Sequence, residues 1–479
     1  MTKYEQIMEK LEENQTIGRG DVISGEERSN IVAQTGMFWN TYNHFYENKM
    51  SDEDLMVQTT QTYWQSMKLT KERLKQWGLT MQVERGVNSA DGRNKCVRRQ
   101  NKHNTVEEYV ENVKAKRIFY KDGRKIYGRK AKETCQTDFL QSAIVGEEAF
   151  CPNCGGVGKV SSYIDGCDYC NSKFTVKELE QKISGFSFRE DVAGKLKKFA
   201  LIVDNVSRVF FTIALIALVP LLIFFALSSD ANPFGVGDFL EALVVLGFYT
   251  GFVYLFSLGI VSLINMFFIK SIETKYGERI TCADIEDSVK LQFSAQDFAE
   301  NLEWKLKSIM LTSGMERIKT FVQCDVSEVE TLRKDVVDSS MTSLHIYKLD
   351  RKEDVYEIAA RAVMRNYYYR NGKITESSEE FDVLATCKKE VEEHPIWALR
   401  QHQCTGCGSS VDVFNGGVCE YCGKEMDYSN VGWIIRNVKH IGRAKSAYPK
   451  LAWKLIRGYL IALVISLVLA IVEIVKSGM

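Results

Sequence analysis

Two long apolar segments interrupt the chain. Val209 to Leu227 is nineteen residues without a charged side chain, and Ala242 to Ile269 is twenty-eight. A helix needs about 20 apolar residues to cross a hydrocarbon layer, so these segments predict two transmembrane helices. A third run, Gly458 to Val475, has one acid near its end. It predicts a C-terminal span, with an amphipathic or core helix as the alternative.

The hydrophobic pattern of the other regions changes once in each half of the chain. In the second half, apolar residues recur at helical spacing from Phe293 to Gln323 and alternate in short runs from Ser343 onward. Asp122-Gly123 and Asn371-Gly372 are typical of tight hairpin turns. We therefore predict two α+β units, each with helices followed by an antiparallel meander. The expected elements are a helix at Glu53–Trp77, strands at Glu107–Tyr120 and Gln136–Ile144, and in the second unit strands at Leu344–Leu349, Val355–Arg370, Phe381–Lys388 and Ile396–His402.

The two units also match in sequence. Thr134-Cys135 recurs as Thr386-Cys387, and Phe119 to Gly123 recurs as Tyr368 to Gly372. The offset between matching residues grows along the chain, as small loop insertions in the second copy would cause. The sequence therefore predicts an internal duplication, with the apolar segments between the copies.

Two groups of four cysteines lie at matching places in the copies. Each reads Cys-x2-Cys, then twelve or eleven residues, then Cys-x2-Cys, which is the spacing of a zinc ribbon. The ligands predicted are Cys151, Cys154, Cys167 and Cys170 in the first copy and Cys404, Cys407, Cys419 and Cys422 in the second. Four thiolates leave no position for water, so we expect two structural zinc ions. Disulfides and iron are the alternatives that spacing leaves open.

Charges that flank the apolar segments predict the topology. Lys195, Lys197, Lys198 and Arg208 precede the first segment, whereas Ser228 to Glu241 has three acids and no base. Lysine and arginine stay on the cytoplasmic side, so both large regions are expected in the cytoplasm of a multi-pass cell-membrane protein. That compartment keeps thiols reduced. The polar N-terminus has no signal-peptide core.

The first copy carries an excess of basic residues. The chain as a whole is neutral, with 62 Lys and Arg against 62 Asp and Glu, but fourteen bases and four acids lie between Arg93 and Lys132. Each base near an anionic leaflet contributes about 1 kcal/mol to binding. We predict that Arg98, Arg99, Lys116 and Arg117 bind an anionic surface, most simply membrane lipid. A solvated face without a partner and nucleic-acid binding are the alternatives.

Catalysis has no support in the sequence. The six histidines are scattered, and no phosphate-binding or dinucleotide motif occurs. Glu376, Glu379 and Glu380 are interpreted as a solvated strand end. The five cysteines outside the clusters are interpreted as small core residues: Cys96, Cys135, Cys282, Cys324 and Cys387. The chain is predicted not to be an enzyme.

Part of the second copy resembles a known family. Phe293 to Phe298 opening a helix, Trp397 to Arg400 leading into Cys404, and Gly417 to Gly423 are similar to bacterial proteins with a domain resembling the inner-mitochondrial-membrane translocase subunit 44. The resemblance covers residues near 285–440, and 46–175 more loosely through the duplication. It departs from the family at Thr405, where a proline is usual. It implies a cone-like sheet with helices, of the nuclear-transport-factor-2-like superfamily, and an apolar cleft.

The predicted function is a membrane-anchored, cytosol-facing zinc-binding scaffold or adaptor. It would capture a protein, peptide or lipid in an apolar cleft, in protein transport or membrane assembly. Nucleic-acid binding by the basic copy, or an enzyme using the cleft, is the alternative. The domains expected are an N-terminal helical extension (1–45), first α+β copy (46–148), first ribbon (149–178), cytosolic linker (179–207), transmembrane helices (208–228 and 239–269), second α+β copy (285–401), second ribbon (402–428), basic juxtamembrane segment (429–456) and third span (457–475).

Overall fold

The structure is a computed structural model. It describes residues 21–86, 94–100, 104–142, 144–145, 147–151, 156–169, 171, 180–192, 194–203, 205–206, 267, 279–282, 295–312, 318, 321–352, 354–388, 401–404, 406–412, 418–419, 421–425, 433–458 and 461. The chain divides into two compact units. One unit consists of Met1–Glu190 with Arg279–Ala444, and the other consists of Asp191–Glu278 with Lys445–Met479.

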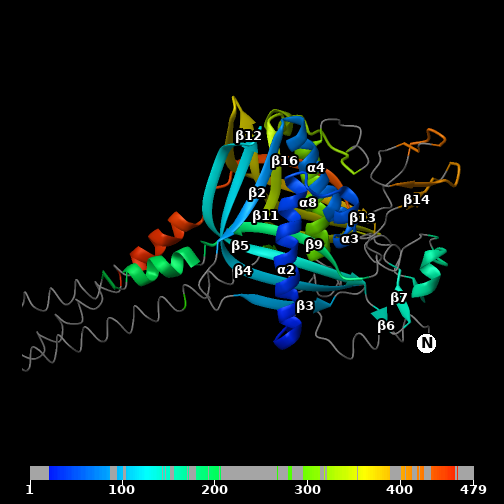
Figure 1. Ribbon diagram of the computed structural model, residues 1–479, viewed down its shortest axis with the longest axis horizontal. Helices are drawn as coiled ribbons and strands as arrows, with labels where there is room; N and C mark the ends of the chain where they lie inside the picture. Colours follow the sequence, from blue (N-terminus) through cyan, green and yellow to red (C-terminus); the bar gives the residue numbers. More distant parts are fainter. Residues whose placement is uncertain are drawn as a thin grey trace, which may run out of the picture. The chain divides into compact units, whose positions relative to one another are not determined.

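The first unit contains two mainly antiparallel sheets together with helices, which confirms the predicted α+β class (Figure 1). The first sheet contains β1 (Asp21–Val22), β2 (Leu79–Gly86), β3 (Lys95–Gln100), β4 (Asn104–Lys121), β5 (Arg124–Ser142) and β9 (Lys182–Glu190). The second contains β10 (Ile280–Cys282), β11 (Val336–Lys352), β12 (Val355–Arg370), β13 (Lys373–Lys388) and β16 (Ile434–Arg443). The small strands are β6 (Ile144–Val145), β7 (Glu148–Phe150), β8 (Val157–Lys159), β14 (Gln401–Gln403) and β15 (Ser410–Asp412).

The two large sheets repeat one order of elements. In each, a long hairpin forms the centre, β4–β5 in the first and β12–β13 in the second. Both predicted turns are confirmed: Asp122 and Gly123 have φ of 49° and 74°, and Asn371 and Gly372 have φ of 49° and 76°. Positive φ at both central residues matches the right-handed twist of the strands. β2 and β3 pair along β4 as the single strand β11 pairs along β12.

The last strand of each large sheet follows the ribbon region instead of preceding it. β9 pairs with β5, and β16 pairs with β13. The predicted linker at 179–207 and the predicted juxtamembrane segment at 429–456 therefore each contain a strand of a sheet, and these two assignments were wrong. Both segments are rich in basic residues but also contain alternating apolar residues, which the prediction did not use. Among them are the buried Phe186, Phe188, Ile435 and Val438. Each ribbon is inserted into its α+β unit.

The fourth strand predicted for the second α+β unit, Ile396–His402, is not part of the second large sheet. Its last two residues lie in β14, which pairs with β15 in a separate two-stranded sheet. Residues 396–400 lie outside the described residues. The other three predicted strands of this unit are confirmed as parts of β11, β12 and β13.

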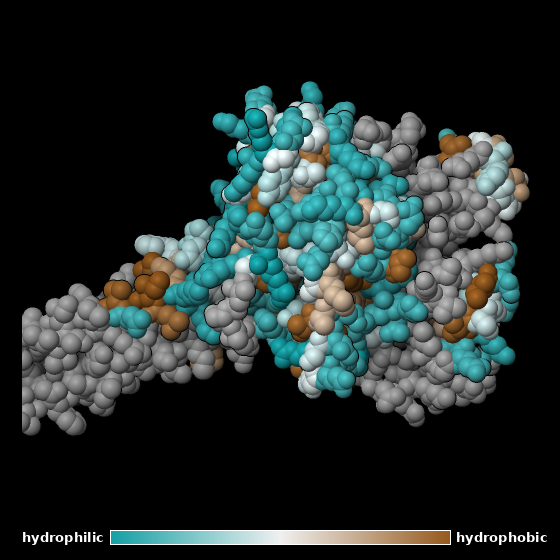
Figure 2. Space-filling view, viewed as in Figure 1, coloured by the Kyte–Doolittle hydropathy of each residue, from teal (hydrophilic) through white to brown (hydrophobic). Residues whose placement is uncertain are grey.

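Helices cover the sheets. α2 (Gly25–Tyr46) lies in the region predicted as an N-terminal helical extension (1–45), but it crosses the first sheet and belongs to its core (Figure 1). The Trp39 indole N–H donates to the Val83 carbonyl at 2.8 Å, and the Val83 N–H donates to Asn43 at 2.7 Å. The remaining helices are α3 (Asp52–Gln58), α4 (Gln61–Gln76), α8 (Ala295–Leu311) and α9 (Ser327–Arg333). The face over α2 and α4 in Figure 2 is mainly hydrophilic, with small separate hydrophobic areas.

The helix predicted at Glu53–Trp77 is broken in two. Thr59 and Thr60 leave the helix, and the Thr60 N–H donates to the Ile183 carbonyl of β9 at 2.9 Å. Ser51 and Thr60 cap the N-termini of α3 and α4 with their side-chain oxygens. Local capping and a contact distant in the sequence thus replace one helical turn.

The hydrophobic cores of the two sheets interlock. The first core contains the aromatic side chains of α2 packed on Phe186 and Phe188, and it also includes Tyr367, Tyr369 and Ile374 from the second sheet. In return, Leu69 of α4 packs against the second core. Each core therefore includes at least one side chain from the other half of the chain.

The second unit is described in part. Val192 and Leu196 pack with Leu451 and Ala452, and the Phe199 and Tyr448 rings lie 6.2 Å apart. The three predicted spans lie outside the described residues, apart from a few positions at their ends. Within the part of the chain that the structure describes, no helix combines the length and the apolar character needed to cross a bilayer.

Lys305 of α8 provides a test of the core of the second sheet, which includes Phe321 with Trp304 packed against it. Its ammonium group is buried against the Trp304 and Phe321 rings, at 5.7 and 5.8 Å from their centres, and donates to the Trp433 carbonyl. Burial lowers the pKa of Lys305 to about 7. The unfolded side chain has a pKa of about 10.4, so the unfolded chain binds more protons between these values. Stability therefore rises with pH through this window. Below it, the full free-energy cost of burying the charged ammonium group is present.

We predict that Lys305→Met stabilises the protein at about pH 6, by roughly 1–2 kcal/mol after the loss of the Trp433 hydrogen bond. The gain should shrink toward pH 10. Denaturant unfolding followed by tryptophan fluorescence measures it. Lys373→Met, at an exposed turn, is the control and should change little. A lower stability of Lys305→Met at every pH would contradict the prediction.

Candidate metal centre

The four cysteines of the second ribbon converge as predicted. The sulfurs of Cys404, Cys407, Cys419 and Cys422 all lie within 4.8 Å of one another. Cys404 Sγ lies 3.6 Å from Cys422 Sγ, and Cys407 Sγ lies 3.7 Å from Cys419 Sγ. These distances exceed the disulfide length of about 2.05 Å and approach the edge of about 3.8 Å of a tetrahedron with Zn–S bonds of about 2.3 Å. The geometry indicates a zinc site.

Two tight turns of the backbone present the sulfurs. The Cys404 N–H donates to the Ser409 carbonyl at 2.8 Å, and the Gly408 N–H donates back to the Cys404 carbonyl at 2.8 Å. The turn at Cys419 has the same pair of bonds, with Gly423 in the place of Gly408. Gly408 and Gly423 have φ of 73° and 70°, which a residue with a Cβ adopts only with strain. The glycine after each second cysteine therefore closes the turn.

The surroundings favour thiolates but do not ionise all four sulfurs equally. The Cys407 backbone N–H lowers the pKa of Cys404. The Ser409 hydroxyl, 3.1 Å from Cys407 Sγ, lowers the pKa of Cys407 to about 6. Cys422 differs: the Lys424 N–H lowers its pKa, but the hydrogen bond shared with Cys407 and desolvation raise it to about 12. A divalent cation would remove this competition, because metal binding displaces the protons.

Zinc fits this set of ligands. Four sulfur ligands complete a tetrahedral site, so zinc here would hold the ribbon together and have no position open for substrate. Four thiolates outweigh the charge of Zn²⁺, so the loaded centre would be anionic. Because the ribbon has little apolar core of its own, metal binding would supply much of its folding free energy.

The first ribbon is described in part. Cys151 and Cys167 are buried around Tyr163, whose hydroxyl donates to the Ala149 carbonyl at 2.6 Å. Cys154 and Cys170 lie outside the described residues. Among the described residues, one group of four cysteines can hold a metal, so the second zinc ion stays a prediction.

The backbone around Cys151 and Cys167 nevertheless repeats that of the second ribbon. The Cys151 N–H donates to the Gly156 carbonyl at 2.7 Å, as Cys404 does to Ser409. The Asn171 N–H donates to the Cys167 carbonyl at 2.7 Å, and Asn171 has φ of 58°. Asparagine is the residue that best replaces glycine in this conformation.

The four residues predicted to bind an anionic surface have different surroundings. Arg117 is buried and pairs with Asp338, so its assignment to a surface was wrong. Arg98 pairs with Glu107 and Glu27. In the same way Arg99 pairs with Glu108 at 3.1 Å, and Lys116 pairs with Glu84 at 2.7 Å. The acids that the net charge counted separately neutralise these bases in space.

Another set of bases lies together on the outer face of β4 and β5. Lys114 is directly opposite Lys132, and Lys116 is directly opposite Lys130. The side chain of Lys125 extends over Gly128 on the same face, since a Cβ there would lie 2.6 Å from its Nζ. Like charges directly opposite on a sheet are destabilising. We call this set, Lys114, Lys116, Lys125, Lys130 and Lys132, the lysine face. In the second sheet, by contrast, Arg361 of β12 lies opposite Asp382 of β13, and these opposite charges pair at 2.8 Å.

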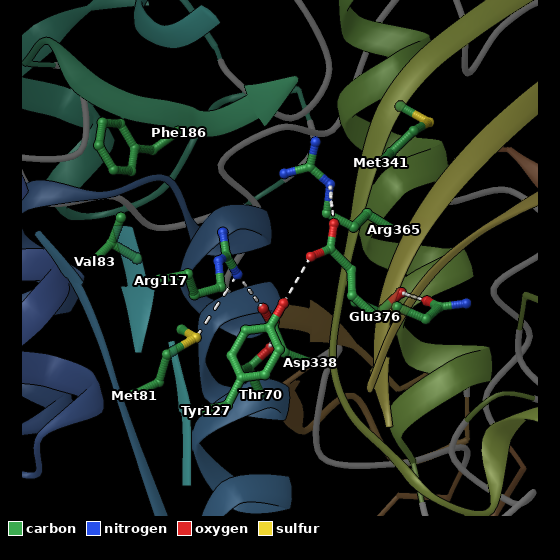
Figure 3. Close-up of polar contacts among 12 residues, drawn as sticks. Thr70, Met81, Val83, Arg117, Tyr127, Phe186, Asp338, Met341, Arg365 and Glu376 are labelled. Atoms are coloured by element: carbon green, nitrogen blue, oxygen red, sulfur yellow. Dashed lines mark hydrogen bonds and ion pairs between the residues drawn. The ribbon is translucent and has the colours of Figure 1, made fainter. Parts of the chain in front are cut away.

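Buried charges join the two sheets. The Arg117 guanidinium of β4 lies 2.5 Å from Asp338 of β11, whose other oxygen accepts a hydrogen bond from Thr70 of α4 at 3.0 Å. Figure 3 shows Arg117 pointing at both Asp338 and Met81. The Arg117 guanidinium also lies 4.9 Å from the centre of the Tyr367 ring. We call the buried contacts between the two large sheets, with this pair at their centre, the seam.

The seam has a reciprocal pair. Arg365 of β12 contacts Glu133 of β5, so each sheet gives an arginine to a carboxylate of the other. Glu376 of β13 accepts a hydrogen bond from Tyr127 at 3.0 Å (Figure 3). It also pairs with Arg129. Burial opposes ionisation of Glu376, but Arg365 and then Arg129 hold its pKa below the usual value.

These contacts correct the interpretation of the acids in β13 as a solvated strand end. Glu376 is part of the seam, and Glu379 is buried with its carboxylate 3.0 Å from His440 of β16. Sequence spacing missed both pairs because their partners lie more than sixty residues away in the sequence. Of the cysteines outside the clusters, Cys96, Cys135 and Cys387 are buried as predicted, whereas Cys282 and Cys324 are only partly buried.

A third contact across the seam comes from α4. Arg73 donates to the Val336, Arg333 and Lys334 carbonyls at 2.9, 3.0 and 2.8 Å. These carbonyls belong to the end of α9 and the start of β11, where α9 leaves carbonyls without helical partners. An arginine from the first half of the chain thus completes a helix end in the second half.

Comparison with family models, curated proteins and solved structures found no match to this chain. The resemblance to the translocase-subunit-44 family therefore stays a prediction.

We predict that Cys407→Ser lowers the zinc content of the purified, reduced full-length protein by one ion per chain, because three thiolates hold the metal less tightly than four. Elemental analysis measures the content. Cys324→Ser, a cysteine outside the clusters, is the matched control and should keep the wild-type value. An unchanged zinc content in Cys407→Ser would refute the site.

Proposed function

We propose that this chain is a membrane-anchored, cytosol-facing scaffold that binds a protein, peptide or lipid and is not an enzyme. The supporting observation is the seam, which joins two sheets and two interlocked cores into one body and uses its buried charges for that purpose. The four-cysteine centre adds a structural metal site without an open coordination position. Rigid surfaces held in this way suit binding.

The two sheets support the proposal that the chain arose by duplication of one module. Their hairpins have the same turns, and a ribbon precedes the last strand in both. The two modules would then bind each other, with one arginine contributed from each side. A duplicated module can assign different partners to its two copies.

Membrane attachment in this proposal rests on the sequence. The uncharged runs at Val209–Leu227 and Ala242–Ile269 are long enough to span a bilayer, and the positive charges flanking them favour cytosolic domains. Anionic lipid is the partner proposed for the first copy. The lysine face is the proposed binding surface in place of Arg98, Arg99 and Arg117, which were predicted from the sequence. Lys116 belongs to both sets. Lys116 already pairs with Glu84, so Lys114, Lys125 and Lys130 would supply most of the attraction to anionic headgroups.

We predict that anionic lipid slows amide hydrogen exchange in β4 and β5. The full-length protein would be placed in nanodiscs of phosphatidylcholine alone or with phosphatidylserine added. Protection should appear only with phosphatidylserine and should weaken as salt rises. Lys114→Gln with Lys130→Gln should remove it. Lys352→Gln with Lys373→Gln, which removes the same charge from exposed sites of the second sheet, should not.

Equal exchange in the two kinds of nanodisc would contradict lipid binding by the lysine face. Protection by an oligonucleotide in neutral nanodiscs would instead favour the nucleic-acid alternative.

A further inference from the structure

Each ribbon exposes a tyrosine at the same place in its second turn. Tyr169 stands directly before Cys170, and Tyr421 stands directly before Cys422. Both side chains are 72% exposed. Tyrosine usually buries more of its ring, so its repeated exposure at matching positions is informative. An apolar side chain is also exposed near each one, Ile164 in the first ribbon and Val418 in the second.

Both tyrosines stand on a hydrogen-bonded turn. The Asn171 N–H closes the turn around Tyr169 at 2.7 Å, and the Gly423 N–H closes the turn around Tyr421 at 2.8 Å. In the first ribbon the ring also lies against Gly156, where a Cβ would be 2.4 Å from the ring. A ring that is already held in place loses little conformational entropy when a partner binds.

Exposed carboxylates stand close in sequence to both tyrosines, in contrast to the lysine face. The second ribbon, residues 402–428, contains four acids and one lysine, whereas the first, residues 149–178, contains three acids and three lysines. Asp165 and Asp168 beside Tyr169 are exposed, as is Glu425 near Tyr421. Zinc held by four thiolates would add negative charge. This potential attracts ammonium and guanidinium groups and repels phosphate.

An exposed aromatic ring beside carboxylates is a site for a cationic side chain. The ring face attracts the cation, and the carboxylates supply a longer-range attraction. Tyrosine is also one of the side chains that contribute most to protein interfaces. Nucleic-acid bases also stack on exposed aromatic rings in other proteins, but those rings lie in positively charged grooves that bind the phosphate backbone.

We propose that the ribbon tips, Tyr169 with Asp165 and Asp168 and Tyr421 with Glu425, bind a lysine- or arginine-rich segment of a partner protein. This inference rests on the proposed function as a binding scaffold and names the chemistry of its protein partner. The ribbons would bind a cationic partner while the lysine face binds an anionic surface.

The test uses full-length, zinc-loaded protein and a fluorescent peptide of alternating lysine and glycine, with binding followed by anisotropy. Tyr169→Ala with Tyr421→Ala should weaken binding at least about ten-fold. Tyr169→Phe with Tyr421→Phe should keep binding within about two-fold, because the ring remains. Tyr347→Ala is the matched control, since Tyr347 is 43% exposed on β11 outside the ribbons. Zinc content should equal that of the wild type in every variant.

Asp168→Asn with Glu425→Gln should also weaken binding, and more so at low salt. Unchanged affinity in the double alanine variant would overturn the proposal. So would equal affinity for a peptide of alternating glutamate and glycine, or tighter binding of oligothymidylate than of the basic peptide. The lipid experiment is separate, so failure here with intact protection by phosphatidylserine would reject the basic partner and leave the membrane scaffold.

Discussion

The ion pair between Arg117 and Asp338 is the contact on which the rest of this fold depends. Both groups are buried, and each belongs to a different sheet. A buried charge without its partner costs several kcal/mol, whereas the intact pair contributes little net stability. The pair therefore acts mainly by penalising any arrangement in which the sheets separate. The Arg365–Glu133 pair and the three hydrogen bonds of Arg73 impose the same penalty at other points.

This constraint explains where binding surfaces can lie. Faces turned toward the seam are used for packing, as the exchange of Tyr367 and Leu69 between the cores shows. The outer face of β4 and β5 and the tips of the inserted ribbons lie outside the seam. They carry opposite charge, lysines on the one and carboxylates on the other. A neutral chain can thus present two surfaces of opposite sign.

Local patterns in the sequence predicted the local structure well. The hairpin turns at Asp122 and Asn371 and the spacing of Cys404 to Cys422 depend on a few adjacent residues, and the structure has both. The strands β9 and β16 were missed because each reaches its neighbour only after a ribbon has intervened. Arg117 was counted as a surface base because its partner, Asp338, lies 221 residues away. Charge tells how many bases a segment has, but only the fold tells which of them are paired.

Hydrogen exchange on Asp338→Ala tests most directly whether the seam makes the two sheets one body. The substitution lies in β11, and it leaves Arg117 of β4 buried without its carboxylate. At a cost of about 3 kcal/mol, amides of β4 and β5 should exchange roughly a hundred-fold faster, together with those of β11 and β12. Faster exchange confined to the second sheet, with β4 and β5 as protected as in the wild type, would contradict the account.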